Sequence, residues 1–402
     1  MQIQNPAKVR SSLPLRVFKQ LLSSLVTVLH KKNNSHAAFQ NNLYVKKSRA
    51  TPQLARQRLI WTLASFIILN GSMIVWIYFQ SQLRDPQFGD KLQRFQKRFL
   101  QEKPDHTIIM LGSSHTGMGL AAREMEDHLY QETAQSWLIY NFGIPSAGPI
   151  MELRHWHKIW LKMQQNQFHP DLVLLELHPA LLSLTPAQPI EGRGLNLQQM
   201  ESAELELLQR YGMINQANDI TSWYLWNLMP FSSLRFELLG RVLPLWLPTG
   251  LRYDWGRKTD RCGWNASPWI NPHPEQKNKA FAQAKMEYAV ILENLRMEGQ
   301  AAEAFQVLVQ TIQNKNIPVV VVLTPEGEKF RQWYTPLSQH HLQNYLHELE
   351  RKFHVPIINA RDWNPENDFL DSHHLLQPGA KKFSLQLCKE LIRRKIIPEA
   401  GR

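Results

Sequence analysis

The chain has 402 residues, 43% of them hydrophobic and 20% charged, so it is long and apolar enough to bury a sizeable core. The net charge is +12, but residues 1–58 hold 11 of the Lys and Arg residues and no Asp or Glu, which leaves about +1 for the rest. This distribution argues against a basic surface for nucleic acid on the main part of the chain. The two cysteines, Cys262 and Cys388, are too few for a disulfide framework or a cysteine-based metal site, and we expect free thiols or one bridge.

The basic tail, residues 1–58, contains a partly amphipathic run at 13–30, LPLRVFKQLLSSLVTVLH. This run fits a helix that lies on a membrane surface. The tail as a whole fits a disordered basic segment equally well, and the sequence leaves both alternatives open.

Residues 59–79, LIWTLASFIILNGSMIVWIYF, form a run of 21 residues without a charge. A helix of about 20 apolar residues crosses a bilayer, and aromatic rings such as Trp61 and Trp76 favour its two interfaces. The basic tail precedes the run, so the positive-inside rule predicts a cytoplasmic N-terminus. The run starts too far along the chain for a cleaved signal peptide. We therefore expect a single-pass anchor in a bacterial inner (cytoplasmic) membrane and a periplasmic main domain.

Residues 80–104 are charged and rich in Gln, and they predict a helical stalk between the membrane and the main domain. Beyond the stalk, short apolar runs alternate with amphipathic stretches, which is typical of a parallel sheet with helices on both faces. The predicted strands are 107–111, 137–140, 172–177, 318–323 and 355–359, and the predicted helices include 150–163, 337–352 and 379–393. We therefore expect an α/β domain made of residues 105–180 and 315–395.

Residues 181–314 interrupt this alternation. They are rich in Leu, Trp and Pro, and the stretch 223–269 has no clear period. A long helical pattern runs from Glu275 to about Asn314. We expect a mainly helical insertion, or cap, over the sheet.

A candidate nucleophile follows the first predicted strand. The sequence Gly112-Ser113-Ser114 joins this strand to an apparent helix, which puts Ser114 at the carboxyl end of a strand. Ligands of open α/β sheets bind at that edge. The free N–H groups at the start of a helix also stabilise a developing anion.

A candidate base lies near the C-terminus, in Asp371-Ser372-His373-His374. A carboxylate three residues before a histidine can orient the imidazole and set its tautomer, so that His374 activates a serine hydroxyl. His373 remains an alternative base, and Asp368 remains an alternative carboxylate.

Together the two segments resemble the SGNH (GDSL-like) hydrolase superfamily. Gly112-Ser113-Ser114 lies over the family's first block, Gly-Asp-Ser, with Ser in place of Asp, and Asp371-x-x-His374 lies over its last block, Asp-x-x-His. The resemblance covers residues 105–180 and 315–395. It implies a flavodoxin-like parallel sheet and a catalytic triad of Ser114, Asp371 and His374.

The two middle blocks of the family depart further. Asn141-Phe142-Gly143 and the residues after it resemble the second block, whose backbone N–H helps to form the oxyanion hole, and the register gives Ser146 that position. The third block, Gly-x-Asn-Asp, has no counterpart for its Asn, and His178 occupies the Gly position. The resemblance thus makes Gly143, Ser146 and His178 the expected oxyanion or substrate-binding residues, with His115 as a further substitute donor.

The Gly-Ser-Ser start and the altered third block are similar to a membrane-anchored branch of the superfamily, which includes the D-alanylation and alginate O-acetylation accessory proteins. That branch works beside a membrane-bound O-acyltransferase. The resemblance therefore implies a serine esterase or O-acyltransferase that acts on cell-envelope glycan or glycolipid acyl esters, with a membrane-bound O-acyltransferase as a partner.

The sequence predicts no cofactor and no metal site, because the histidines do not fall at metal-ligand spacings; His155-x-His157, for instance, spans two faces of a helix. Two alternatives remain. The domain is a non-catalytic accessory that binds glycan or scaffolds a membrane-bound O-acyltransferase, or residues 1–58 act as a basic membrane or nucleic-acid binder.

Overall fold

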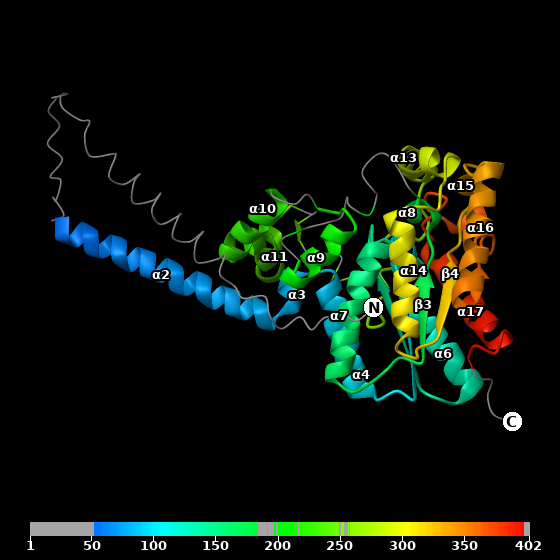
Figure 1. Cartoon of the computed structure of the whole chain (residues 1–402), viewed down its shortest axis with the longest axis horizontal. Coiled ribbons are helices and arrows are strands. Elements are labelled where there is room, and N and C mark those ends of the chain that lie inside the picture. The colour runs from blue at the N-terminus through cyan, green and yellow to red at the C-terminus, as the bar shows by residue number, and fades with distance from the viewer. Residues whose placement is uncertain are drawn as a thin grey trace. The chain divides into compact units, whose positions relative to one another are not determined.

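The apolar runs form a five-stranded sheet in the order β2-β1-β3-β4-β5, and every pairing of neighbouring strands is parallel. The computed structural model describes residues 52–183, 191, 197, 200–214, 218–248, 251–252, 256 and 258–397 (Figure 1). The strands are β1 (His106–Gly112), β2 (Trp137–Gly143), β3 (Leu172–Glu176), β4 (Val319–Leu323) and β5 (Ile357–Asn359). The expected α/β class with a parallel sheet is confirmed, and the amphipathic run at 13–30 lies outside the described residues.

Successive strand residues point to opposite faces of the sheet, and each face has its own hydrophobic core. On β1, Ile109 and Leu111 join one core, whereas Ile108 and Met110 join the other. Both faces are therefore apolar, as a parallel sheet covered by helices on both sides requires.

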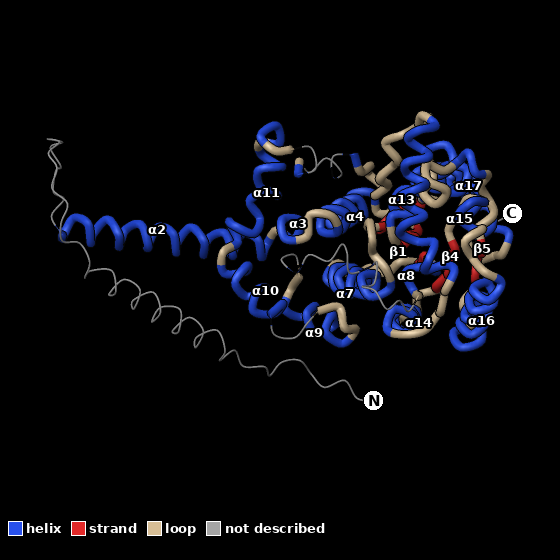
Figure 2. The backbone as a smooth tube through the Cα atoms, turned by 90° about the horizontal axis from the view of Figure 1, so that it is seen from above, coloured by secondary structure: helices blue, strands red, loops and turns tan. Residues whose placement is uncertain are grey.

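Helices enclose the strands (Figure 2). The first core receives side chains from α4, α7, α14 and α16, and the second receives them from α6 and α17. The described α-helices are α2 (Pro52–Phe79), α3 (Ser81–Arg84), α4 (Phe88–Glu102), α5 (Ser114–Gly119), α6 (Ala122–Thr133), α7 (Pro149–Gln165), α8 (Pro179–Leu182), α9 (Ser202–Arg210), α10 (Asn218–Leu228), α11 (Pro230–Val242), α13 (Pro274–Glu293), α14 (Gln300–Gln313), α15 (Glu328–Arg331), α16 (Pro336–Phe353) and α17 (Gln377–Arg393), and the 3₁₀ helices are η3 (Pro244–Trp246) and η5 (Glu366–Asp368).

The helix α2 is the one described helix that is long and apolar enough to span a membrane. The span covers Pro52–Ile77, with a mean hydropathy of 1.8, and 6% of its apolar window is buried. A buried core helix would show the opposite, so this helix is exposed along almost all of that window.

The expected stalk at 80–104 is wrong for most of its length, because α4 packs into the core. Its apolar residues Phe88, Leu92 and Phe95 are buried in the core that covers one face of the sheet. They are spaced four and three residues apart, so they share one face of the helix. The charged and Gln-rich composition hid this spacing.

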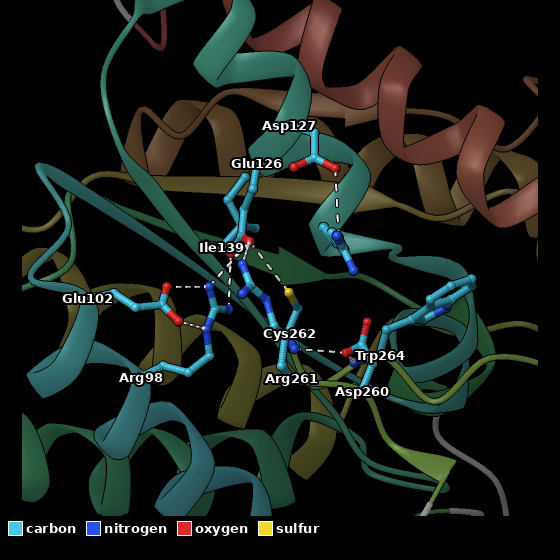
Figure 3. A network of polar contacts seen from close by, with 10 residues as sticks. Arg98, Glu102, Glu126, Asp127, Ile139, Asp260, Arg261, Cys262 and Trp264 are labelled. Carbon is cyan, nitrogen blue, oxygen red and sulfur yellow. Dashed lines mark hydrogen bonds and ion pairs between the residues drawn. The ribbon is translucent and has the colours of Figure 1, made fainter.

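An ion-pair network also ties α4 to the sheet (Figure 3). Arg98 lies 3.1 Å from Glu126 on α6 and 2.7 Å from Glu102 on its own helix. Glu126 in turn accepts a hydrogen bond from the backbone N–H of Ile139 on β2, at 2.8 Å. Cys262 contributes its thiol to the same carboxylate, and both Cys262 and Cys388 are free and buried.

The insertion expected at 181–314 also needs a new boundary. Two helices, α13 and α14, replace the single helical stretch expected between Glu275 and Asn314. Ala304, Phe305 and Leu308 of α14 are fully buried in the core over the sheet, so α14 belongs to the α/β layers.

The helices α10 and α11 and the turn η3 carry many exposed apolar side chains. Leu234 of α11 packs with Ile77 at the end of α2 and with Leu83 of α3. Other side chains stay exposed, and Leu245 and Trp246 reach 83% and 77%. The exposed apolar residues here are Tyr224, Leu225, Trp226, Leu228, Met229, Phe236, Val242, Leu243, Leu245, Trp246 and Leu251. We call this set the α10–η3 apolar surface.

Candidate active site

Ser114 begins α5, directly after the turn that follows β1. Ser113 caps the helix, and its hydroxyl accepts a hydrogen bond from the N–H of His115 at 3.1 Å. Gly112 is required at the end of the strand, since a Cβ there would overlap the side chains of Thr116 and Glu176. Ser114 is only partly buried, as the candidate nucleophile of the sequence analysis would have to be.

Glu176, the last residue of β3, holds this turn through hydrogen bonds. Its buried carboxylate accepts hydrogen bonds from the N–H and hydroxyl of Ser113 and from the N–H and hydroxyl of Thr116, at 2.5–2.9 Å. Burial raises the pKa of Glu176, and the four hydrogen bonds oppose that rise. The carboxylate thus holds Ser113 and Thr116, the residues on either side of Ser114 and His115, in place.

The structure brings the three expected triad residues together. The hydroxyl oxygen of Ser114 lies 2.8 Å from Nε2 of His374, and Nδ1 of His374 lies 2.7 Å from Oδ2 of Asp371. The second carboxylate oxygen, Oδ1, accepts the backbone N–H of His374 at 2.7 Å and that of His373 at 3.2 Å. The serine and the aspartate are far apart in sequence, and the sheet topology makes them neighbours.

The electrostatics of the pair suit a general base. Burial opposes protonation of His374, but the charge of Asp371 and its hydrogen bond outweigh burial and raise the pKa of His374 above 6.5. Burial alone would raise the pKa of Asp371, but the charges of His374 and His373 hold it far below its usual value. An ionised carboxylate at Nδ1 keeps the proton of the ring there and leaves the Nε2 lone pair toward Ser114.

The alternative carboxylate, Asp368, and the alternative base, His373, have other partners than Ser114 and His374. Asp368 accepts hydrogen bonds from Lys382 and from Asn364, each at 3.0 Å. The Nδ1 of His373 lies 3.2 Å from Oδ1 of Asp371, and its ring stacks on Phe330. In this geometry Asp371 and His374 are the pair aligned with Ser114.

The end of β2 and the loop after it were expected to bind the oxyanion or the substrate, but Gly143 has a structural role here. The N–H of Gly143 donates to Oδ1 of Asn141 at 2.9 Å, so it is not free for an oxyanion. A Cβ at Gly143 would lie 2.6 Å from Cα of Gly117 and 2.7 Å from O of Ser113, so this glycine permits close packing against α5. Ser146 is partly buried and has a φ of 60°, which turns the chain sharply before α7.

Lys91 of α4 holds the end of β2, just before this loop, through hydrogen bonds. This buried ammonium group donates to the carbonyl of Gly143 at 2.7 Å and to that of Asn141 at 3.1 Å. Burial lowers the pKa of Lys91 to about 7. The helix expected as a stalk therefore supports the loop that contacts α5.

His178 lies in a buried cluster behind the triad. Its Nε2 is 3.2 Å from Nε2 of His115, whose Nδ1 is 3.3 Å from the hydroxyl of Thr324. The ring of Tyr288, from α13, lies 4.9 Å from that of His373, so part of the insertion reaches the cluster. The structure gives no contact between His178 and Ser114, and its expected oxyanion role stays a prediction.

The cluster contains a histidine group that sequence spacing did not reveal. His115, His373 and His374 each offer a ligand atom, and these atoms lie within 4.8 Å of one another. One histidine comes from α5 and two come from the loop before α17. Adjacent or distant histidines of this kind give no spacing motif, so sequence spacing alone could not reveal this group.

The sequence analysis did not assign Glu176, Thr324 and Tyr288 to the site. The first two had a usable signal, because each is a polar residue at the end of an apolar strand run or directly after it. Tyr288 had none, since its position depends on how α13 folds over the sheet edge.

A cavity of about 730 Å³ lies away from the triad, where Ile77, Phe88, Lys158, Trp223 and Leu234 contribute to its lining. Ser114 and His374 do not line it.

Comparison with known proteins adds little to this geometry. A model of an uncharacterised family matches residues 291–396, about a quarter of the chain, which include Asp371 and His374 but not Ser114. None of the curated proteins searched matches the chain.

Proposed function

We propose that this chain is a membrane-anchored serine esterase or O-acyltransferase of the SGNH type, which acts on acyl esters of cell-envelope glycans or glycolipids. The observation that carries the proposal is the continuous relay from the Ser114 hydroxyl through His374 to Asp371, with distances of 2.8 and 2.7 Å. A serine hydroxyl is a poor nucleophile without such a base.

The reaction follows from the direction of this relay. His374 takes the proton of Ser114 as its oxygen attacks the ester carbonyl carbon, and the backbone N–H groups of Ser114 and Ser146 stabilise the oxyanion. The protonated His374 then gives the proton to the departing alcohol, which leaves an acyl group on Ser114. Water completes hydrolysis, or a sugar or polyol hydroxyl completes transfer, after His374 has removed its proton.

The fold supports the SGNH assignment. The strand order 2-1-3-4-5 is that of flavodoxin-like sheets, which bind ligands at the switch point between the first and third strands. Ser114 follows β1 at this switch point, and Asp371 and His374 precede the last helix, α17. Both positions agree with the first and last blocks of the family.

The membrane setting rests on α2 and the α10–η3 apolar surface. Trp226 and Trp246 belong to this surface, and tryptophan favours the interface of a bilayer. α11 packs against the end of α2, so a spanning α2 brings the surface close to the lipid. The positive-inside rule then orients the chain with residues 1–58 in the cytoplasm and the α/β domain in the periplasm. A membrane-bound O-acyltransferase is the partner that the resemblance suggests.

Labelling with a fluorophosphonate tests the proposal directly. The full-length protein in detergent is expected to react at Ser114, as identified by mass spectrometry of the labelled peptide, and heat-unfolded protein is expected not to react. Ser114→Ala removes the nucleophile and is expected to abolish labelling without loss of the folded state. Labelling that persists in Ser114→Ala would contradict the proposal.

A second candidate is a non-catalytic accessory domain that binds glycan or scaffolds a membrane-bound O-acyltransferase. It is favoured by the third block, which has no Asn donor, and by the Gly143 N–H, which is already bonded to Asn141. Folded wild-type protein that resists the probe, yet binds an acylated oligosaccharide, would favour this candidate over the enzyme.

A further inference from the structure

Three histidine rings meet at the carboxyl edge of the sheet, beside the triad. His115 and His373 are buried, with 4% and 3% exposure, and the side chain of His374 is 19% exposed. Their available ligand atoms lie within 4.8 Å of one another. The fold therefore presents three imidazoles to one small volume that is open to solvent through His374.

The second nitrogen of each ring has an oxygen neighbour, which sets the tautomer. Nδ1 of His374 faces Oδ2 of Asp371 at 2.7 Å, and Nδ1 of His373 faces Oδ1 of the same carboxylate at 3.2 Å. Nδ1 of His115 faces the hydroxyl of Thr324 at 3.3 Å. A proton on each Nδ1 leaves a lone pair on each Nε2, as in metal sites whose histidines donate through their other nitrogen. Nε2 of His374 now lies 2.8 Å from the Ser114 hydroxyl, and Nε2 of His115 lies 3.2 Å from Nε2 of His178, so a metal ion would replace these two contacts.

One of these lone pairs lacks a partner. Nε2 of His373 is buried and has no hydrogen-bond partner among the residues that the structure describes. A buried polar atom left in this state costs free energy, so a ligand that bonds to it is favoured.

We propose that Nε2 of His115, His373 and His374 form a binding site for a divalent transition metal ion of the Zn²⁺ type. Imidazole nitrogens suit Zn²⁺, Cu²⁺, Ni²⁺ and Fe²⁺ rather than Mg²⁺ or Ca²⁺, which prefer oxygen. A tetrahedral ion with Zn–N bonds of about 2.0–2.1 Å separates its nitrogens by about 3.4 Å, so the rings must move inward by an ångström or so. A water or the Ser114 hydroxyl takes the fourth position.

The site shares an atom with the relay. Nε2 of His374 lies 2.8 Å from the Ser114 hydroxyl and has one lone pair, so it accepts either a proton or a metal ion. A bound ion therefore blocks proton removal from Ser114 and acts as an inhibitor. This consequence rests on the proposed function, whereas the metal site itself does not.

Titration with Co²⁺ tests the site on untagged, full-length protein that has been stripped with a chelator. Co²⁺ in a tetrahedral nitrogen environment absorbs visible light strongly, so one equivalent is expected to produce this absorption, and Zn²⁺ is expected to displace it. His373→Gln is expected to weaken Co²⁺ binding at least about tenfold, and Thr324→Val about 10–100-fold through the orientation of His115. The matched control His340→Gln changes an exposed histidine on α16 and is expected to bind like the wild type.

The two proposals fail separately. Ser114→Ala is expected to keep the Co²⁺ absorption although it loses fluorophosphonate labelling, because the three imidazoles remain and a water can take the fourth position. Absence of tetrahedral absorption from folded protein, or equal binding by His373→Gln and wild type, would overturn the metal site. Zn²⁺ is expected to slow labelling of the wild type, and labelling that continues at full rate with the site occupied would overturn its inhibitory role.

Discussion

The substitution Asp371→Asn keeps His374 in the site but removes the carboxylate that orients its ring. The amide oxygen can still accept the backbone N–H groups that Oδ1 accepts now, at 2.7 and 3.2 Å. The amide nitrogen replaces Oδ2 and cannot accept the Nδ1 proton of His374. The ring then favours the tautomer with its proton on Nε2, the atom that faces Ser114. In serine triads this error lowers the rate about 10⁴-fold.

The assay is the second-order rate of fluorophosphonate labelling, measured in chelator so that metal ions do not interfere. The stability cost is smaller, about 1–3 kcal/mol, because a charged acceptor becomes a neutral one while two of the three hydrogen bonds remain. The variant is therefore expected to stay folded.

Asp368→Asn is the matched control. It makes the same change three residues earlier, on a carboxylate that bonds to Lys382 and Asn364, and it is expected to label like the wild type. Equal labelling of Asp371→Asn and wild type, or an equal loss in Asp368→Asn, would refute the assignment of Asp371.

Three further predictions test the supports of the site. Gly143→Ala is expected to lower the unfolding free energy, measured by urea titration, and to slow labelling, because its Cβ would lie 2.6 Å from the Cα of Gly117. Gly119→Ala is expected to change neither quantity, because its Cβ would lie 3.5 Å from the nearest side-chain atom. Because the pKa of Lys91 falls from 10.5 to about 7 on folding, the unfolding free energy of the wild type relative to Lys91→Met is expected to rise with pH across that window. A difference that does not change with pH would argue against the lowered pKa of Lys91. A fluorophore attached at Trp246→Cys, in protein reconstituted into vesicles, is expected to be quenched by nitroxide lipids, and one attached at the exposed control His347→Cys is not. Absence of quenching at Trp246→Cys would place the α10–η3 apolar surface away from the bilayer.

The sequence predicted the sheet well because parallel strands are continuously apolar. All five predicted strands exist, with shifts at their ends; the last begins at Ile357 rather than Val355, since Pro356 has no N–H for the ladder. The packing of α4 escaped prediction for the opposite reason. A few apolar residues at helical spacing bury a helix whose average composition is polar, so composition was the wrong guide.

The candidate site was predictable only in part. A motif at each end of the domain pointed to Ser114, Asp371 and His374, and the sheet order brings them into contact. The roles of neighbours depended on contacts that no local pattern encodes. Gly143 was expected to take part in oxyanion or substrate binding, but its N–H already donates to the side chain of Asn141. The convergence of His115 with His373 likewise depends on how two loops meet in space.

The support that Lys91 gives to Asn141 and Gly143 constrains how a soluble version of this protein can be made. A truncation at residue 105, where the sequence seemed to begin the domain, would delete the ammonium group and strip a helix from the core. The core side chains that α4 covers would then be exposed and would favour aggregation, and the loop beside Ser114 would lose the hydrogen bonds from Lys91. A secreted fragment for crystallography should instead retain α4 in full, and an inactive preparation that lacks it would say nothing about the chemistry of the intact chain.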